Sequence, residues 1–401
     1  MSNLKEYRFD ELYQMDSGIS TTKDQAGHGA PFVSFRDIYN NPILPDILTE
    51  KMDTSEEEQK RYSVKKGDIF LTRTSEVLDE LAMSSVAVKD YPKATFSGFA
   101  KRLRPIQDNI TYDKFMAFYL RSIYFRKVIN AKAIMTLRAS FNEQIFSYIK
   151  LLLPDYQIQV KIGDFFYKIE CKIRNNNKIC AELESMAKTI YDYWFLQFEF
   201  PNEDGKPYKS SGGKMVWNNE LKSEIPEGWE VKEIGTILDA IPKTKKYSVS
   251  EYKREGKYPI IDQSKKYICG YTDNQDDLIK FGSAIIFGDH TKEIKYVNFP
   301  FARGADGTQI LVSNNDRLSN YLLYLQISQM DLVNQGYSRY FKFLKDRIVI
   351  IPSETINKKF EKITCDFTIK VRNNLFENQS LISLRDFLLP LLMNGQIGFK
   401  A

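Results

Sequence analysis

LPDYQIQVKIGDFFYKIECKIRNNNKICAELESMAKTIYDYW, residues 153–194, decides the fold because the chain carries a second copy of it 198 positions later. Leu153-Pro154 is echoed by Ile351-Pro352, and Ile173-Arg174-Asn175-Asn176 by Val371-Arg372-Asn373-Asn374. The two copies align without a gap over roughly forty residues. Agreement over that length indicates an internal duplication in which each half of the chain ends in the same element.

Both copies have the apolar spacing of an amphipathic helix, in steps of three and four residues. Each helix is expected to run for about 40 residues, or ~60 Å, with Pro154 and Pro352 in the first turn. Two such helices in one chain can bury their apolar stripes against each other as a coiled-coil pair. The alternative is that each helix packs only on its own domain. The stripes are Ile158, Ile162, Phe165, Ile169, Ile173, Leu183, Met186 and Ile190 in the first copy, and Ile356, Phe360, Ile363, Phe367, Val371, Leu381, Leu384 and Leu388 in the second.

The repeat continues upstream of the helices, but more loosely. Tyr7–Leu12 resembles Trp229–Ile234 at an offset of 222, and Gly67–Leu71 resembles Gly282–Ile286 at an offset of 215. The second pair has turn residues that lead into short apolar runs, which predicts buried strands. The halves are joined by Pro201–Lys214, which is rich in turn-forming residues. Each half is therefore predicted to be a strand-rich globular segment followed by a long helix.

Composition limits the class of protein. The chain has 401 residues, 43% of them hydrophobic and 27% charged, and a net charge of +5, which is typical of a globular protein with two or three domains and permits a nucleic-acid partner. Four cysteines form no C-x-x-C pair and only two histidines are present, so neither a disulfide framework nor a His-based metal site is indicated. The start has no apolar leader, and no run of ~18 apolar residues occurs. We therefore expect a cytoplasmic protein with no membrane partner.

The central stretch LESMAKTIYDYWFLQFEFPNEDGKPYKSSGGKMVWNNELKSEIPEGWE, residues 183–230, resembles the central conserved region of the specificity (S) subunit of type I restriction–modification systems. The two-half layout and the closing helix, from Asn378 to Phe399, are similar to that family as well. In architecture the resemblance covers the whole chain. At the level of motifs it is strongest in the centre and weakest in the two globular segments. The first half lacks the Pro-x-Gly-Trp lead-in that the second half has at Pro226–Trp229.

The resemblance implies a mixed α/β fold with an internal pseudo-two-fold repeat. Two globular target recognition domains would be separated by a pair of long antiparallel coiled-coil helices. The first target recognition domain is expected at residues 1–153 and the first spacer helix at 154–200. A central linker loop is expected at 201–228, the second target recognition domain at 229–351, and the second spacer helix at 352–401.

The resemblance also implies a function. Each target recognition domain would read one part of a split sequence in double-stranded DNA, while the helices set the spacing and dock two methyltransferase (M) subunits. The assembly would methylate adenine at N6 and, with restriction (R) subunits, cleave DNA. S-adenosylmethionine, ATP and Mg are expected on those partners and no cofactor on this chain, which would be a non-catalytic specificity subunit.

Charge along the chain supports a DNA partner independently of the resemblance. Nine basic and two acidic residues lie between Ser97 and Ser140, and eight basic and three acidic residues lie between Lys243 and Gly270. Each half therefore has a basic region that can neutralise phosphates. For any single lysine, the alternative is a solvated helix face.

Base readers are polar side chains on positioned loops, and each half offers such loops next to a predicted strand. In the second half, the alternatives are that His290 caps a turn and that the Gly-rich run RGADGTQ, residues 303–309, is a simple hairpin. The candidate DNA contacts of the first half are Thr72, Arg73, Thr74, Ser75, Lys101, Arg102, Arg138 and Ser140. Those of the second half are Lys243, Lys245, Lys246, Lys265, Lys266, His290, Thr291, Lys292, Arg303, Gln309 and Arg339.

Motifs for catalysis are missing from the sequence. It contains no Asn/Asp-Pro-Pro-Tyr motif of an adenine methyltransferase, no F-x-G-x-G cofactor loop and no G-x-x-x-x-G-K phosphate loop. Pro45-Asp46 with Glu50-Lys51 has the wrong spacing for a PD…ExK nuclease. Three hypotheses for the function of the chain are therefore open: a DNA-recognition subunit of a multisubunit enzyme, an orphan DNA-binding adaptor, and a duplicated scaffold that binds only proteins.

Overall fold

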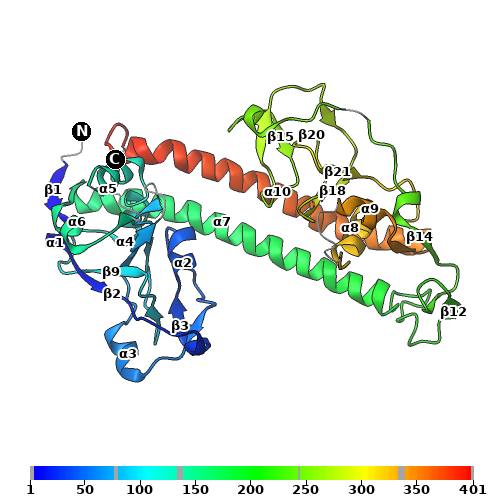
Figure 1. The fold of residues 1–401 in the computed structure, drawn as a ribbon, viewed down its shortest axis with the longest axis horizontal. Helices are drawn as coiled ribbons and strands as arrows, with labels where there is room; N and C mark the ends of the chain where they lie inside the picture. Colours follow the sequence, from blue (N-terminus) through cyan, green and yellow to red (C-terminus); the bar gives the residue numbers. More distant parts are fainter. Residues whose placement is uncertain (1–3, 76–79, 133–138, 243, 333–338, 399–401) are drawn as a thin grey trace. The chain divides into compact units, whose positions relative to one another are not determined.

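The structure, a computed structural model, forms two compact units (Figure 1). The first unit comprises the described residues of Met1–Asn175 and Glu377–Ala401, and the second comprises those of Asn176–Phe376. Both units mix helices and strands, which confirms the predicted α/β class. The described residues are 4–75, 80–132, 139–242, 244–332 and 339–398.

The elements of the first unit, in chain order, are β1 (Lys5–Arg8), α1 (Phe9–Leu12), β2 (Tyr13–Ser17), β3 (Ala26–Val33), α2 (Phe35–Asn40), β4 (Lys51–Met52), α3 (Glu56–Arg61), β5 (Ile69–Thr72), β6 (Thr74–Ser75), β7 (Ser84–Val86), β8 (Thr95–Phe96), β9 (Ala100–Pro105), α4 (Asp113–Tyr119), α5 (Ile123–Lys132), β10 (Ala139–Ser140), α6 (Glu143–Tyr148) and β11 (Lys150–Leu153). A four-stranded antiparallel sheet has the order β2-β9-β5-β7. Beside it, β3 pairs antiparallel with β4 and parallel with β8. Two strand pairs, β1 with β11 and β6 with β10, complete the unit.

The elements of the second unit are β12 (Met215–Asn218), β13 (Ser223–Pro226), β14 (Glu230–Glu233), β15 (Tyr258–Ile261), β16 (Gly270–Thr272), β17 (Leu278–Ile279), β18 (Ala284–Gly288), β19 (Ile294–Val297), β20 (Phe301–Arg303), β21 (Thr308–Leu311), α8 (Asn320–Ser328), α9 (Tyr340–Lys345) and β22 (Ile348–Ile351). Its sheets have the orders β16-β15-β20-β17 and β19-β18-β21, with the pairs β14-β22 and β12-β13. Part of the predicted central linker loop is thus the hairpin β12-β13. It lies near the stacked rings of Phe200 and Trp229, whose centroids are 5.0 Å apart.

Two long helices, α7 (Tyr156–Tyr191) and α10 (Glu354–Met393), are 36 and 40 residues long, close to the predicted length. Asp155 and Ser353 precede them, and their carbonyl oxygens accept the first helical hydrogen bonds. Pro154 and Pro352 therefore precede these capping positions and do not lie in the first turn, where they were expected. Asp and Ser are favoured at the cap because their side chains can accept N–H groups that the first turn leaves without a partner.

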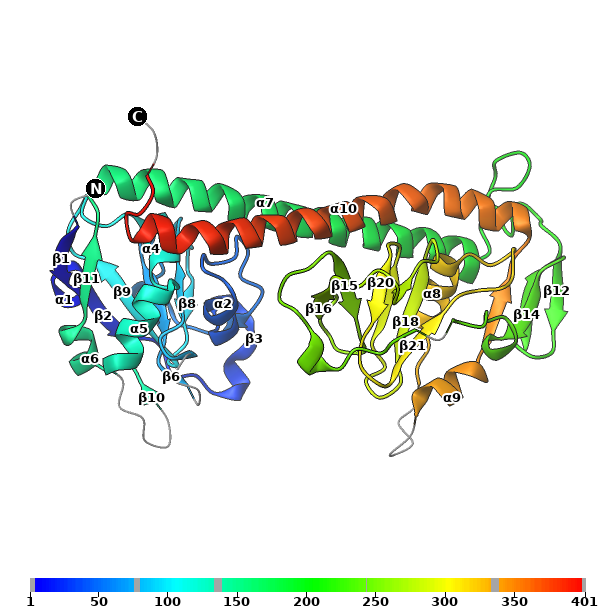
Figure 2. The same ribbon diagram turned by 90° about the horizontal axis from the view of Figure 1, so that it is seen from above.

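Within each unit, segments of α7 and α10 lie side by side and run in opposite directions (Figure 2). In the first unit, Lys172 forms an ion pair with Glu377 at 3.2 Å, and Glu170 lies 3.7 Å from Arg385. In the second unit, the Asn374 Nδ2 donates to the Asn176 carbonyl oxygen at 3.4 Å. Coiled-coil packing along the whole length of the helices stays a prediction.

The main core of each unit lies between the sheet and these helical segments, where apolar side chains are removed from water. In the first unit the core includes Ile69, Leu71, Phe115, Phe166 and Leu392, and in the second it includes Ile285, Phe287, Leu322, Trp194 and Phe360.

Strand register corrects the upstream part of the predicted repeat. The Arg73 amide donates to the Phe99 carbonyl oxygen across β5 and β9 as the Asp289 amide donates to the Gly307 carbonyl oxygen across β18 and β21, so Ile69 is equivalent to Ile285 at an offset of 216 rather than 215. A shift of one residue would send every side chain to the opposite face of the strand. Similarly, β1 pairs with β11 as β14 pairs with β22, so Lys5 is equivalent to Glu230 at an offset of 225 rather than 222.

The repeated arginines of the two helices hold the globular part of each unit. Arg174 donates from Nη1 to the Leu44 carbonyl oxygen at 3.3 Å and from Nη2 to the Ile43 carbonyl oxygen. Its counterpart Arg372 donates to the Asn298 carbonyl oxygen at 3.2 Å. The R-N-N triplet was visible in the sequence, but this anchoring role was not.

Replacement of Arg174 by alanine is expected to destabilise the first unit by about 1.5–3 kcal/mol, because the charged hydrogen bonds to two carbonyl oxygens are lost. Denaturant unfolding followed by circular dichroism measures the change. Arg61→Ala is the matched control, since Arg61 is exposed at the end of α3. Equal stability of Arg174→Ala and Arg61→Ala would contradict the anchoring role.

Candidate nucleic-acid interface

Each unit gathers several loops at one edge of its sheet. In the first unit, antiparallel register places Ser17 at the end of β2 opposite Lys101, and Thr72 at the end of β5 opposite Ala100. The loops after β2 and β5 and the turn before β9 therefore meet at the same edge. We call this the first loop edge, and its counterpart in the second unit the second loop edge.

Backbone hydrogen bonds tie the first loop edge together. The Arg73 amide donates to the Phe99 carbonyl oxygen at 2.8 Å, and the Phe141 amide donates to the Arg73 carbonyl oxygen at 2.8 Å. The Ser97 amide donates to the Val33 carbonyl oxygen at 3.1 Å, which brings in the end of β3. Segments that are far apart in sequence thus share one surface.

The second loop edge is built by the same three bonds. The Asp289 amide donates to the Gly307 carbonyl oxygen at 2.8 Å, and the Tyr340 amide donates to the Asp289 carbonyl oxygen at 3.0 Å. The Gly304 amide donates to the Ile261 carbonyl oxygen at 2.8 Å. By these bonds Asp289 is equivalent to Arg73 and Gly307 to Phe99, so the loops after β5 and β18 are equivalent.

Gln263 holds three loops of the second loop edge, and sequence reasoning missed it. Its Nε2 donates to the Asp306 carbonyl oxygen at 2.8 Å, and its Oε1 accepts the His290 amide at 3.2 Å. The Gln263 carbonyl oxygen accepts the Thr291 hydroxyl at 2.6 Å. Nothing in the sequence around Gln263 signals this role, because its partners lie 27–43 residues away.

Several predicted contacts are exposed at the two edges. Arg73 is exposed and, with Lys101, Phe141 and Asn142 among others, lines a hollow of about 290 Å³. Thr74 is half-buried beside it. The exposed candidates of the second loop edge are Lys265, Lys266, His290, Thr291 and Arg339.

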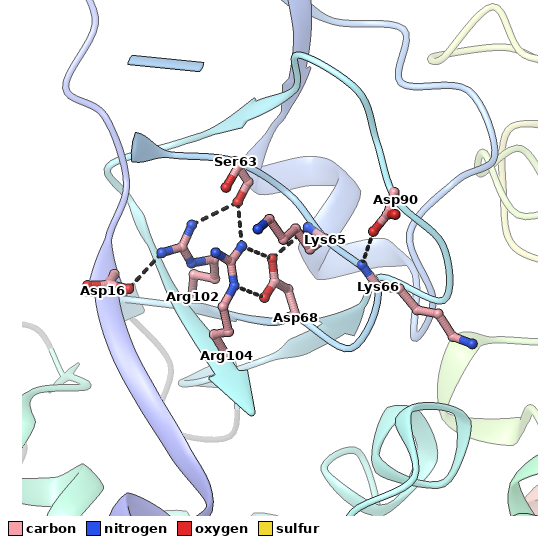
Figure 3. A network of polar contacts seen from close by, with 8 residues as sticks. All are labelled: Asp16, Ser63, Lys65, Lys66, Asp68, Asp90, Arg102 and Arg104. Carbon is pink, nitrogen blue, oxygen red and sulfur yellow. Dashed lines mark hydrogen bonds and ion pairs between the residues drawn. The ribbon is translucent and has the colours of Figure 1, made fainter. Parts of the chain in front are cut away.

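Three predicted contacts of the first unit, Arg102, Thr72 and Lys101, have internal partners instead, and Figure 3 shows those of Arg102. Arg102 is 5% exposed and donates to Asp16 at 2.6 Å and to the Ser63 carbonyl oxygen at 2.7 Å. Thr72 is fully buried, and its hydroxyl accepts the Met83 amide. Lys101 is buried, with its Nζ on the Ser17 hydroxyl at 2.9 Å. We therefore leave Thr72 and Arg102 out of the proposed interface and place Lys101 at the floor of the hollow.

Two predicted contacts of the second unit are also used internally. Lys292 donates to the Leu332 carbonyl oxygen, and its Nζ lies 4.4 Å from the centre of the Tyr340 ring. Arg303 donates to the Thr308 carbonyl oxygen and thereby closes the Gly-rich run. Burial lowers the pKa of this guanidinium. These side chains shape the second loop edge, and we do not propose them as base readers.

Of the remaining candidates of the second unit, two form ion pairs and one is half-buried. Lys245 lies 2.7 Å from Glu251, and its hydrogen bond helps to hold the pKa of that carboxyl at about 2. Lys246 lies 3.0 Å from the exposed Asp306. Gln309 is half-buried on β21. Exposed ion pairs of this kind contribute little to stability, so both lysines can exchange a carboxylate for a phosphate at small cost.

Four candidates are described in part or not at all. Ser75 and Ser140 lie on the paired strands β6 and β10, where Ser140 is opposite Thr74 and Ser75 is opposite Ala139. Arg138 and Lys243 lie outside the described residues.

Alanine at both Lys265 and Lys266 is expected to weaken DNA binding about equally for all sequences. Loss of two phosphate-neutralising charges makes the slope of log affinity against log salt shallower by about two. Lys257→Ala with Lys280→Ala is the matched control, because both lysines are exposed at the opposite ends of β15 and β20 from the loop edge. A slope equal to that of the control variant in a salt titration would remove these lysines from the interface.

The described part of the chain shows neither a group of metal ligands nor a membrane-spanning helix. No three His, Cys, Asp or Glu side chains among the described residues are placed to hold a metal ion. Among the same residues, no helix has the length and apolar character needed to span a membrane.

A family model, two relatives and a solved structure that resemble this chain all belong to type I restriction systems. The family model "Type I restriction modification DNA specificity domain" matches residues 1–185 and 226–375. The chain is 24% identical to the type I restriction enzyme MjaIX specificity subunit of Methanocaldococcus jannaschii, over 94% of this chain and 88% of that protein. It is 22% identical to the type I restriction enzyme HindI specificity subunit of Haemophilus influenzae, over 99% of this chain and 100% of that protein. A crystal structure of the type I restriction–modification S subunit from M. genitalium has a similar fold, with a TM-score of 0.58 and 16% identity over 98% of this chain and 96% of that one.

Proposed function

The chain belongs to the family of type I restriction–modification DNA specificity domains, and we propose that it is the subunit that reads a bipartite DNA site for such a system. The observation that carries the proposal is that one chain builds the same loop edge twice, with equivalent backbone hydrogen bonds in each unit. Two readers in one chain suit two half-sites separated by unread base pairs.

Within each loop edge, the exposed side chains divide between two tasks. Lys265 and Lys266 at the second loop edge are exposed and suit phosphate contacts, which supply affinity without sequence information. Arg73 and His290 stand on hydrogen-bonded loops after equivalent strands and suit contacts to base edges. A rigid backbone beneath such a side chain limits the bases that it can reach.

We further propose that α7 and α10 set the spacing of the half-sites and dock two methyltransferase subunits. Neighbouring exposed apolar side chains on a helix suit an interaction surface. Met186 on α7 is 50% exposed, and Leu384 on α10, its counterpart 198 residues later, is 44% exposed. Phe387 on α10 is 67% exposed as well. Equivalent apolar sites in the two helices suit two copies of one partner.

The chemistry of the assembly belongs to the partners in this proposal. Methyl transfer to adenine N6 needs the base outside the stack, in a pocket that holds S-adenosylmethionine. The sequence has no motif for that cofactor or for ATP. We therefore assign S-adenosylmethionine, ATP and Mg to the methyltransferase and restriction subunits, and sequence recognition to this chain.

DNA binding by the assembled complex tests this function. We expect weak, salt-sensitive binding by the chain alone and sequence-specific binding once methyltransferase subunits are added. A protein-only scaffold predicts no salt-sensitive DNA affinity in either state. An orphan adaptor predicts DNA binding that methyltransferase subunits do not change. Either result would contradict the proposed role.

A further inference from the structure

The ring of Phe99 is 68% exposed at the first loop edge. Phenylalanine is normally buried, since its removal from water is favourable. Phe99 lies beside Arg73, whose amide donates to the Phe99 carbonyl oxygen. An aromatic ring is therefore presented on the surface that the proposed function assigns to DNA.

The turn that carries Phe99 is rigid. The Ala100 amide donates to the Ser97 carbonyl oxygen at 2.9 Å, and the Phe99 amide donates to the Ser97 hydroxyl at 3.2 Å. The Gly98 amide donates to the Ile19 carbonyl oxygen at 2.8 Å, and a Cβ at Gly98 would lie only 2.9 Å from that oxygen. The ring is thus attached to a hydrogen-bonded turn whose backbone position is fixed.

The second loop edge has no side chain at the equivalent place. Gly307 occupies it with φ +87°, and a Cβ there would lie 2.6 Å from Gln263 Nε2 and 2.7 Å from His290 Cδ2. The space next to this position therefore holds an amide and an imidazole instead of a benzyl group. The two edges share a backbone but present opposite chemistry.

A second exposed aromatic ring strengthens the contrast. Phe35, the first residue of α2, is 38% exposed and stacks on Tyr39 with centroids 6.0 Å apart. Because Val33 is equivalent to Ile261, Phe35 is equivalent to Gln263. Two apolar positions of the first loop edge thus correspond to Gln263 and Gly307 in the second.

We propose that Phe99 is a specificity-determining residue that contacts the C5-methyl group of a thymine in the first half-site. That methyl group is the apolar feature that a base pair presents in the major groove, and phenylalanine is a side chain that contacts it. The inference rests on the proposed function and deepens it: the first unit selects a thymine by apolar contact, whereas the second unit uses polar groups.

Replacement of thymine by uracil tests the proposal, because it removes only the methyl group. The assembled complex is titrated with duplexes in which each thymine of the mapped site is replaced in turn. For the wild type, one replacement in the first half-site is expected to weaken binding by about fourfold. This is the loss of affinity expected when the burial of one methyl group is removed. Phe99→Ala should bind the thymine duplex as weakly as the wild type binds that uracil duplex, and should no longer distinguish the two.

Ile106→Ala is the matched control, because Ile106 is 53% exposed just beyond the far end of β9. It should behave as the wild type in every titration, and unchanged melting temperatures show that both variants are folded.

This inference would be overturned if the wild type bound its site sequence-specifically but no replacement of thymine by uracil changed the affinity. The proposed function would still stand in that case. A Phe99→Ala variant that loses affinity equally for every duplex would overturn this inference too, because that pattern belongs to a wedge between base steps. Wild-type binding without any sequence preference would overturn the proposed function and this inference with it.

Discussion

Exchange of residues 5–153 for the corresponding segment of another family member is expected to change one half of the recognised DNA sequence and to leave the other half unchanged. The exchanged segment runs from β1 to β11 and contains every strand that the structure describes in the first unit. Within the exchanged segment, Arg174 donates to backbone carbonyl oxygens of Ile43 and Leu44, which a different sequence can also supply. Each mismatched base pair costs about 1–3 kcal/mol, so three changed positions would abolish methylation of the original site.

The reciprocal exchange of residues 230–351 provides the matched control. It has the same boundaries in the second unit, since β14 and β22 are equivalent to β1 and β11. Sequencing of methylated DNA from each chimera gives the recognised sequence directly. The first exchange should change one half-site and the second exchange the other. A change in both half-sites after a single exchange would contradict independent reading by the two units.

Replacement of Asp68 by alanine is expected to destabilise the first unit by about 3–5 kcal/mol. Asp68 is fully buried, and its carboxylate accepts two hydrogen bonds from Arg104, at 2.7 and 2.6 Å, and one from the Lys65 amide (Figure 3). Hydrogen bonds to Asp68 raise the pKa of the Arg104 guanidinium. Removal of the carboxylate leaves a partly buried cation without its partner, and the loss is a large share of a typical stability of about 5–15 kcal/mol.

Two probes separate the units in this measurement. All three tryptophans, Trp194, Trp217 and Trp229, belong to the second unit. Circular dichroism should therefore show unfolding of the variant at lower denaturant concentration, while the tryptophan fluorescence transition stays near that of the wild type. Glu6→Ala, which breaks the exposed ion pair with Lys150, is the control and should cost no more than about 1 kcal/mol. A circular-dichroism midpoint equal to that of Glu6→Ala would contradict the account.

The long helices could be predicted from the sequence because their signal is local. Apolar residues recur with helical period in both copies, and an ungapped offset of 198 connects Asp155 with Ser353 and Arg174 with Arg372 in the structure. The strands gave a weaker signal. Their equivalence depends on which residues pair across the sheet, and the correct offsets of 225 and 216 follow from hydrogen-bond register that short sequence matches do not contain.

The candidate interface could be predicted in outline only. A polar loop after a buried strand was enough to predict that Arg73 and His290 are exposed at a loop edge, since strand and loop are adjacent in the chain; their contact with DNA stays a prediction. The burial of Arg102 and its hydrogen bond to Asp16 could not be predicted, because Asp16 lies 86 residues away in the sequence. Phe99 is not among the contacts predicted from the sequence, because base readers were expected to be polar residues.

The central claim is that this chain selects the DNA sequence that its partners methylate. Its most direct test is a map of N6-methyladenine in a host without other adenine methylation, in which the cognate methyltransferase subunit is expressed with and without this chain. We predict one split motif, two short half-sites with a fixed gap, that is methylated only when this chain is present. The same methylated sequences in both strains, or none in either, would contradict the account.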